Sequence, residues 1–112
     1  MSLKLHNTKS GQSEYFTPLN PDRVTLYASG PTVDENDQVG HARASASFDN
    51  LVRHLKALGY KVDYASNYTD VDDKIIKRAN EKNQDWRDLA QTYIDSFSED
   101  MKAIGCLEPT HT

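Results

Sequence analysis

The chain has 112 residues and a net charge of −4, from 13 basic and 17 acidic residues. This length suits one domain over residues 1–112, and an acidic chain without a basic run is a poor binder of nucleic acid by itself. Hydrophobic residues make up only 37% of the chain, which predicts a thin core. The single Cys106 excludes an intrachain disulfide and suits a reducing, cytoplasmic location. Residues 1–12 hold no apolar run, so we expect no signal peptide or membrane anchor there.

The first part of the chain is expected to hold two strands. Residues 3–7 alternate between apolar and polar side chains, which predicts an edge strand or an extended arm. Residues 8–12 predict a polar turn around Gly11, and Tyr15 with Phe16 forms a local apolar plug before two prolines that interrupt regular structure. Residues 23–29 alternate again and predict the second strand.

A helix–strand pair is expected next. Residues 39–58 predict a helix, because apolar side chains recur at helical spacing and Gly59 follows at a position suited to the C-terminal cap. Residues 61–68 predict a strand, so that residues 23–68 form a βαβ unit with parallel strands. One side of both strands is rich in small and polar residues. We therefore expect one sheet face without a covering layer.

Two further helices are expected in the last third of the chain. The first covers residues 70–80, with Thr69 as its cap, three aspartates in its first turn, and Val71, Ile75 and Ala79 as its buried stripe. The second covers residues 85–104 and ends at Gly105. The three aspartates do not converge on one point at a helix start, so they do not predict a magnesium site.

The stretch from Tyr27 to Arg43 carries the strongest functional signal. A strand that ends at Gly30 and leads into a helix beginning near Gly40 favours anion binding, because unpaired N–H groups and the positive end of the helix dipole face the ligand. A full G-x-G-x-x-G is absent. His41 can place an imidazole donor on a phosphate, and the alternative is a first-turn histidine that points into solvent.

Two motifs in this stretch resemble those of cysteinyl-tRNA synthetases, a family of class I aminoacyl-tRNA synthetases. These motifs are Gly30-Pro31-Thr32-Val33 and Gly40-His41-Ala42-Arg43, and the similarity extends to residues 59–62 and 67–80. The resemblance implies an α/β fold: a partial Rossmann-like (HUP-type) βαβ unit with parallel strands, an N-terminal edge strand and two C-terminal helices. It also implies ATP as the cofactor, bound near Gly30, Thr32, Gly40 and His41, and an amino-acid pocket beside Thr69. A capped helix without a ligand explains the segment around Thr69 equally well.

The chain departs from the family pattern at two functional positions. Ser29 stands where the family has a zinc-binding cysteine, so we expect no metal site, and Gln38 replaces the first histidine of the signature. His41 is then a vestigial catalytic residue. Residues 34–37 are acidic or polar where the family has pocket aromatics. Small and polar residues also replace large apolar ones at the strand ends and the helix start, which predicts a resurfaced fragment.

Three hypotheses of function follow. The first is an isolated, engineered and catalytically inactive piece of such a synthetase. The second is a weak ATP- or AMP-binding module, and the third is a cysteine-activating ligase paralogue that needs a partner chain. We expect no tRNA or membrane binding by this chain alone, and self-association through the uncovered sheet face is open. Cys106 is expected to be a small packing residue rather than a nucleophile.

Overall fold

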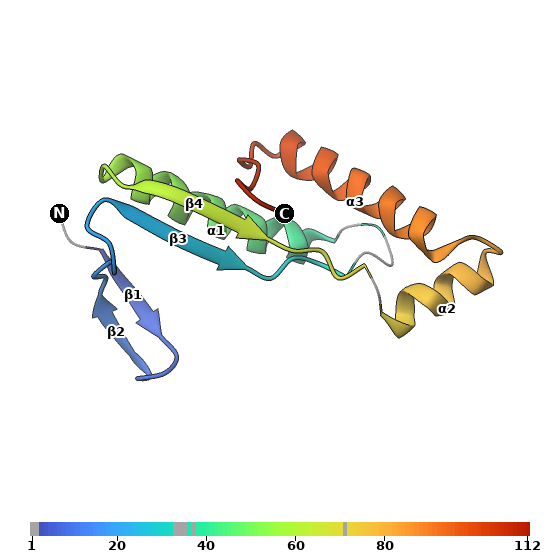
Figure 1. Ribbon diagram of the computed structural model, residues 1–112, viewed down its shortest axis with the longest axis horizontal. Helices are drawn as coiled ribbons and strands as arrows, with labels where there is room; N and C mark the ends of the chain where they lie inside the picture. The colour runs from blue at the N-terminus through green and yellow to red at the C-terminus, as the bar shows by residue number, and fades with distance from the viewer. Residues whose placement is uncertain (1–2, 33–35, 37, 71) are drawn as a thin grey trace.

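The computed structural model describes residues 3–32, 36, 38–70 and 72–112, in which strands and helices follow one another as in Figure 1. The described strands are β1 (Lys4–Asn7), β2 (Gln12–Tyr15), β3 (Arg23–Ala28) and β4 (Lys61–Ser66). The described helices are α1 (Val39–Ala57), α2 (Asp73–Glu81) and α3 (Trp86–Ala103). The chain is thus mixed α/β, as the sequence predicts.

A βαβ unit forms the centre of the molecule. Strands β3 and β4 are parallel, in a register that runs from Arg23 opposite Lys61 to Ala28 opposite Ser66. Helix α1 connects them and begins and ends within a residue of its predicted bounds. Gly59 has a φ of 96°, the left-handed conformation that favours glycine after a helix. The predicted parallel pair is confirmed.

The N-terminal strand does not join this parallel sheet. It pairs with β2 in a separate antiparallel hairpin, from Lys4 opposite Tyr15 to Asn7 opposite Gln12. Strand β2 was not predicted, because its four residues are all exposed and show no apolar alternation. The hairpin meets the βαβ unit where the rings of Phe16 and Tyr60 pack edge to face at 6.3 Å.

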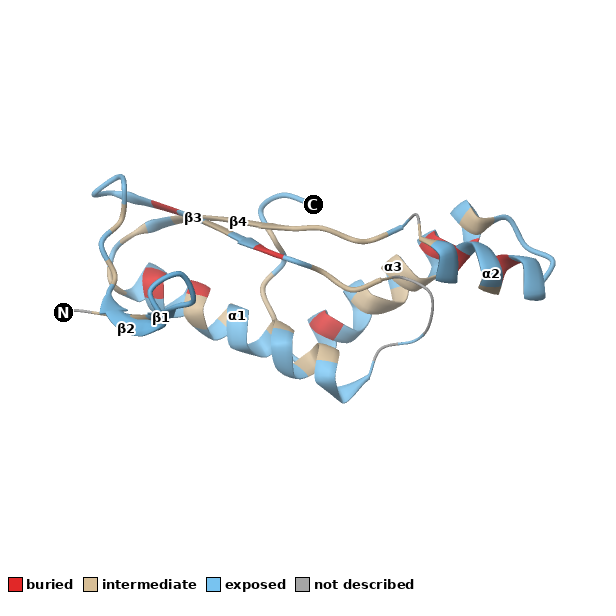
Figure 2. Cartoon of the chain, turned by 90° about the horizontal axis from the view of Figure 1, so that it is seen from below, coloured by how far each residue is buried: buried red, intermediate tan, exposed pale blue. Residues whose placement is uncertain are grey.

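One face of the parallel sheet is open, as predicted. Along β3, Val24 and Ala28 are buried and Leu26 is half-buried, while Thr25 and Tyr27 are exposed, and Tyr27 keeps 67% of its surface accessible. Figure 2 shows helix α1 on one side of the two strands, with no described element over the other side. The alternation of buried and exposed side chains along β3 is therefore that of a sheet covered on one face.

Helix α2 begins later than predicted, and its cap is a different residue. The helix starts at Asp73, and the Asp72 side chain accepts a hydrogen bond of 2.8 Å from the Lys74 N–H. Thr69 was wrongly assigned as the cap. It is held in an extended pairing with Thr32, and its N–H donates to the Pro31 carbonyl at 3.1 Å. The strand predicted over residues 61–68 ends at Ser66. Beyond Ser66, the isolated bridge between Thr32 and Thr69 is all that continues the pairing of β3 with β4 in the part of the chain that the structure describes.

Most of the buried residues form two small groups rather than one core. Val24, Val52 and Leu55 are buried between the sheet and α1, while Ile75, Leu89 and Ala90 are buried between α2 and α3 (Figure 2). Ala28 and Met101 are buried in the wall of a cavity near the strand ends. Val71, predicted in the stripe of α2, lies outside the described residues. The radius of gyration is 16.6 Å, against about 13 Å for a compact chain of this length. The predicted thin core is confirmed, and the molecule is elongated, at 54 × 30 × 24 Å.

None of the described helices is both long and apolar enough to cross a membrane.

Candidate functional site

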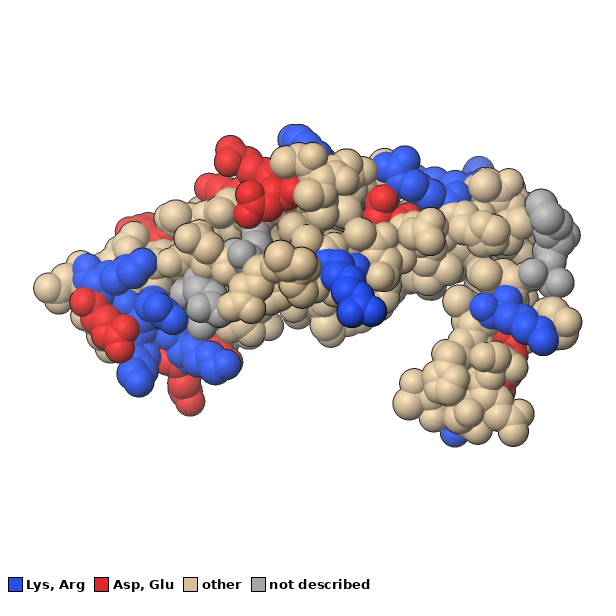
Figure 3. All heavy atoms as spheres, turned by 180° about the vertical axis from the view of Figure 1, so that it is seen from behind, with Lys and Arg blue, Asp and Glu red and all other residues tan. Residues whose placement is uncertain are grey.

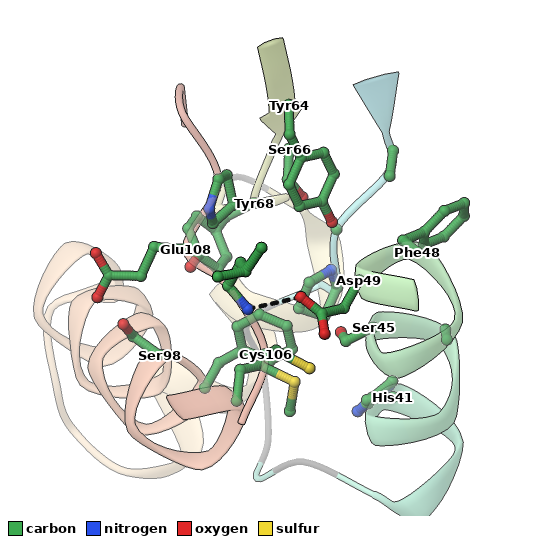
Figure 4. Close-up of a pocket in the computed structure, with 18 of the residues that line it drawn as sticks. His41, Ser45, Phe48, Asp49, Tyr64, Ser66, Tyr68, Ser98, Cys106 and Glu108 are labelled. Carbon is green, nitrogen blue, oxygen red and sulfur yellow. Dashed lines mark hydrogen bonds between the residues drawn. The ribbon is translucent and has the colours of Figure 1, made fainter. Parts of the chain in front are cut away.

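A cavity of about 100 Å³ lies where β3 and β4 end. Its walls come from residues 28–31 after β3, the first half of α1, residues 64–68 of β4 and beyond, the last turns of α3, and residues 106–109. Figure 4 shows side chains from these segments converging on one space. The cavity therefore occupies the carboxyl ends of parallel strands, where ligands bind in open α/β sheets.

The structure brings together two of the predicted site residues and leaves three outside. Gly30 and His41 line the cavity, and so does Ser29. Thr32, Gly40 and Thr69 do not line it. Thr32 and Thr69 pair with each other beyond the strand ends, and Gly40 lies exposed in the first turn of α1. The residues predicted to bind the nucleotide and the amino acid therefore do not all surround one cavity.

Gly30 is needed for contact within the chain itself. A Cβ built at this position would lie 1.6 Å from the Asn67 carbonyl oxygen, so only glycine lets the two strand ends cross there. Its N–H donates to the Asn67 side-chain oxygen at 2.8 Å. The close backbone approach expected for a phosphate is made here by the segment that follows β4.

Gly40 has the opposite surroundings. A Cβ at this position would meet no atom within 4 Å. The packing of the described residues therefore does not require glycine at the start of α1, although a ligand at the helix N-terminus would.

His41 is half-buried and does not simply point into solvent. Its Nδ1 accepts a hydrogen bond of 3.1 Å from the Gln38 N–H, and its own N–H donates to the Gln38 carbonyl at 2.9 Å. An accepting Nδ1 assigns the proton of the neutral imidazole to Nε2. Figure 4 shows the ring extending from α1 along the cavity wall. His41 thus caps its helix and also presents a ring to the cavity.

Asp49 is the main residue that the sequence analysis missed. Its Oδ1 accepts from the Leu107 N–H at 2.7 Å, shown as the dashed line in Figure 4, and its Oδ2 accepts from Arg53 Nε at 2.9 Å. Burial raises the pKa of Asp49, but these hydrogen bonds and the nearby charges of Arg53 and Lys56 outweigh it, so the pKa lies below its usual value. The acid-first spacing of Asp49 and Arg53 was a visible signal, whereas the contact with Leu107 depends on tertiary packing.

Cys106 and Tyr64 complete the wall with groups that are poor acids. Burial, and then the charge of Asp49, raise the pKa of the Cys106 thiol. Burial is also the main cause that raises the pKa of Tyr64. A thiol with a raised pKa is a weak nucleophile, which supports the expected packing role of Cys106. The wall combines four aromatic and two sulfur-containing side chains with serines and a few charged groups, which suits binding rather than covalent chemistry.

The described residues contain no group of three or more His, Cys, Asp or Glu side chains placed to hold a metal ion. Ser29, at the position of the family's zinc-binding cysteine, contributes a hydroxyl at the cavity wall. The absence of a zinc site at Ser29 stays a prediction.

Comparison with known proteins identifies clear relatives. Residues 15–112 match the family described as tRNA synthetases class I (C) catalytic domain. The cysteine–tRNA ligase of Geobacter metallireducens is 49% identical over 99% of this chain and 23% of the relative. That of Hydrogenovibrio crunogenus is 49% identical over 97% of the chain and 24% of the relative. Cysteine–tRNA ligase 2, cytoplasmic, of Arabidopsis thaliana is 48% identical over 99% of the chain and 22% of the relative. The chain therefore spans less than a quarter of the length of these relatives.

Proposed function

The chain belongs to the family of class I tRNA synthetase (C) catalytic domains, and we propose that residues 1–112 form part of its nucleotide-binding half without catalysing adenylation by themselves. The observation that carries this proposal is the size of the cavity. Its volume of about 100 Å³ is below the roughly 300–1,000 Å³ of most ligand pockets. This volume is smaller than a nucleotide needs.

The composition of the site supports the same conclusion. Transfer at a phosphate requires several donors aimed at the developing charge. His41 supplies one imidazole, with its Nε2 carrying the transferable proton, and Gln38 supplies an amide where the family has a second histidine. One half-buried imidazole provides little of the stabilisation that adenylation needs. His41 then acts as a helix cap that descends from a catalytic residue.

The side chains on the surface around the cavity support the hypothesis that the chain is a resurfaced fragment. Ser29, Ala44, Ala46 and Ser47 are exposed, so small or polar side chains cover the places where the sequence analysis expects large apolar ones in the family. An exposed apolar patch at these positions favours aggregation. An engineered origin of this pattern stays a prediction.

A second candidate function is weak binding of ATP or AMP. The open space at Gly40 favours it, because a phosphate can approach the first N–H groups of α1 there without displacing any described atom. In this alternative the triphosphate lies outside the cavity, along Thr32 and Gly40. The third hypothesis, a ligase that is completed by a partner chain, also stays a prediction.

The test combines an activity assay with a binding assay on the 112-residue chain. We expect no cysteine-dependent ATP–pyrophosphate exchange, and a clear exchange signal would contradict the main proposal. Titration with millimolar ATP, followed by amide NMR, tests the second candidate. Shifts confined to Gly40, His41 and their neighbours would support nucleotide binding.

Two histidine variants give the matched comparison. His41→Ala removes the ring at the cavity wall, whereas His54→Ala removes an exposed histidine of the same helix that does not line the cavity. Binding at the predicted site weakens in the first variant and is unchanged in the second. Equal weakening in both, or no ATP-induced shifts in the parent chain, would rule out the nucleotide-binding candidate.

A further inference from the structure

Residues 105–109, which we call the strap, run from the end of α3 along the cavity. Residues 106–109 all line the cavity, so the strap forms one of its walls. The turn into the strap is made by Gly105, whose φ is 84°, and the Cys106 N–H donates back to the Met101 carbonyl at 3.0 Å. The strap therefore leaves α3 in a defined direction, toward α1.

One end of the strap is fastened to α1 by two side chains. Asp49 accepts the Leu107 N–H at 2.7 Å, and Arg53 Nη2 donates to the Gly105 carbonyl at 2.9 Å. Arg53 Nε also donates to Asp49, so the carboxylate and the guanidinium hold each other in place. The Asp49 side chain is only 14% exposed, and water competes little for a charge-assisted bond of this kind.

The segment after the strap is held on the sheet. The His111 N–H donates to the Tyr64 carbonyl at 3.1 Å, and the Ser66 N–H donates to the His111 carbonyl at 3.1 Å. His111 thus pairs with β4 as a short parallel bridge opposite Ala65. Glu108 and Pro109 lie between these two attachment points, and the next residue, Thr110, accepts a hydrogen bond of 3.2 Å from the Tyr64 N–H through its side-chain oxygen.

We propose that Asp49 is a positioning residue that keeps the strap closed over the cavity, and that release of Leu107 from Asp49 opens the cavity while the pairing at His111 persists. The inference goes beyond the proposed function, because it concerns access to the cavity whether or not a nucleotide binds. The Leu107 N–H is partly buried, so loss of its acceptor leaves an unsatisfied donor and favours the open strap.

The first test uses the unmodified chain. Hydrogen exchange of the Leu107 amide, measured by NMR, reports the opening of the strap directly. We expect exchange about 100-fold slower than in an unstructured peptide, as for amides in stable hydrogen bonds. Exchange of Leu107 at the unstructured rate would overturn the proposal without any variant.

The second test uses the single cysteine of the chain as a probe of access. Cys106 belongs to the strap, lines the cavity and is only partly exposed, so release of the strap is expected to speed its reaction with a small disulfide reagent. In Asp49→Ala, which removes the acceptor of the Leu107 N–H, we expect labelling to be about tenfold faster or more, and in Asp49→Asn, which keeps a side-chain oxygen acceptor, we expect a smaller increase. Removal of the Asp49 charge also lowers the pKa of the thiol, so rates are compared on the plateau at high pH, where the thiol is fully ionised.

A matched control lies on the strap itself. Glu108→Gln removes a carboxylate that pairs with Lys102 at 3.4 Å, with both side chains about 70% exposed or more. Such a surface pair contributes little, so labelling of this variant stays within about twofold of the parent. Amide exchange of β3 and β4 shows whether each variant is folded. A folded Asp49→Ala variant with parental labelling, or an equal acceleration in Glu108→Gln, would overturn the proposal.

Discussion

At the scale of single residues, Gly30 and Gly40 show that two glycines of one predicted site can be present for different physical reasons. Both glycines belong to the predicted anion site, and the sequence alone gave them the same explanation. In the folded chain, Gly30 is required by the Asn67 carbonyl, whereas no atom of the described residues lies within 4 Å of a Cβ placed at Gly40. The sequence could not separate the two cases, because the crossing of the strand ends joins residues that are 37 positions apart.

This difference predicts opposite effects of the same substitution. Gly30→Ala places a methyl group against backbone that cannot move aside, and we expect a loss of roughly 3 kcal/mol or more in the free energy of unfolding. Gly40→Ala adds a methyl group in open space at a helical position, and we expect a gain of up to about 1 kcal/mol. Urea unfolding of both variants measures the difference. A Gly30→Ala chain as stable as the parent would mean that the strand ends do not cross as described.

At the scale of elements, the sequence predicts helices and strands better than it predicts their ends. The periodicity of α1 and α3 places both helices within one residue of their observed bounds at most termini, because apolar spacing and terminal glycines act locally. The start of α2 was misplaced by three residues. Thr69, Asp70 and Asp72 are all good caps by type, and only the pairing of Thr69 with Thr32 decides among them.

Cap substitutions test this assignment. Asp72→Ala removes the acceptor of the Lys74 N–H, and we expect a cost of about 1 kcal/mol in stability. Thr69→Val keeps the shape of the side chain but removes the hydroxyl, and we expect a change within about 0.5 kcal/mol. Thermal or urea unfolding provides the comparison. A larger cost for Thr69→Val than for Asp72→Ala would restore Thr69 as the cap.

At the scale of the whole molecule, the candidate site was the least predictable part. The sequence placed His41 and Gly30 at the cavity but gave no sign of the wall formed by residues 106–109, because nothing local indicates that this segment returns to α1. The thin core was predictable from composition. Its division into two groups follows from the length of α3, which carries one end of the molecule away from the sheet (Figure 1). Self-association through the open face near Tyr27 stays a prediction.

Two separate cores should unfold separately. Ile75→Ala removes a fully buried side chain between α2 and α3, and Leu55→Ala does the same between α1 and the sheet. Each is expected to cost about 2–5 kcal/mol locally. The fluorescence of Trp86, which packs against the α2–α3 group, should shift to lower urea in Ile75→Ala and move little in Leu55→Ala. Equal shifts in both variants would indicate a single cooperative core.

The charged side chains are distributed along the length of the molecule. Figure 3 shows lysine and arginine side chains gathered at the end of the molecule that holds α2, with acidic groups interspersed, and another acidic group along the middle. On the face drawn, neither sign forms one broad field among the described residues. This mixture agrees with the net charge of −4, and the expectation that the chain alone does not bind tRNA stays a prediction.

The self-paired hairpin of β1 and β2 has a practical consequence. Its turn is exposed, closes through the Gly11 N–H and the Asn7 carbonyl at 2.7 Å, and leaves open space around Gly11. Exposed turns of this kind accept inserted sequence with little effect on the rest of a chain. A peptide epitope or a fluorescent label inserted after Lys9 would therefore be attached to the exposed turn of the hairpin, outside both cores and remote from the strap. The chain can be immobilised or tracked through this turn while its cavity stays accessible.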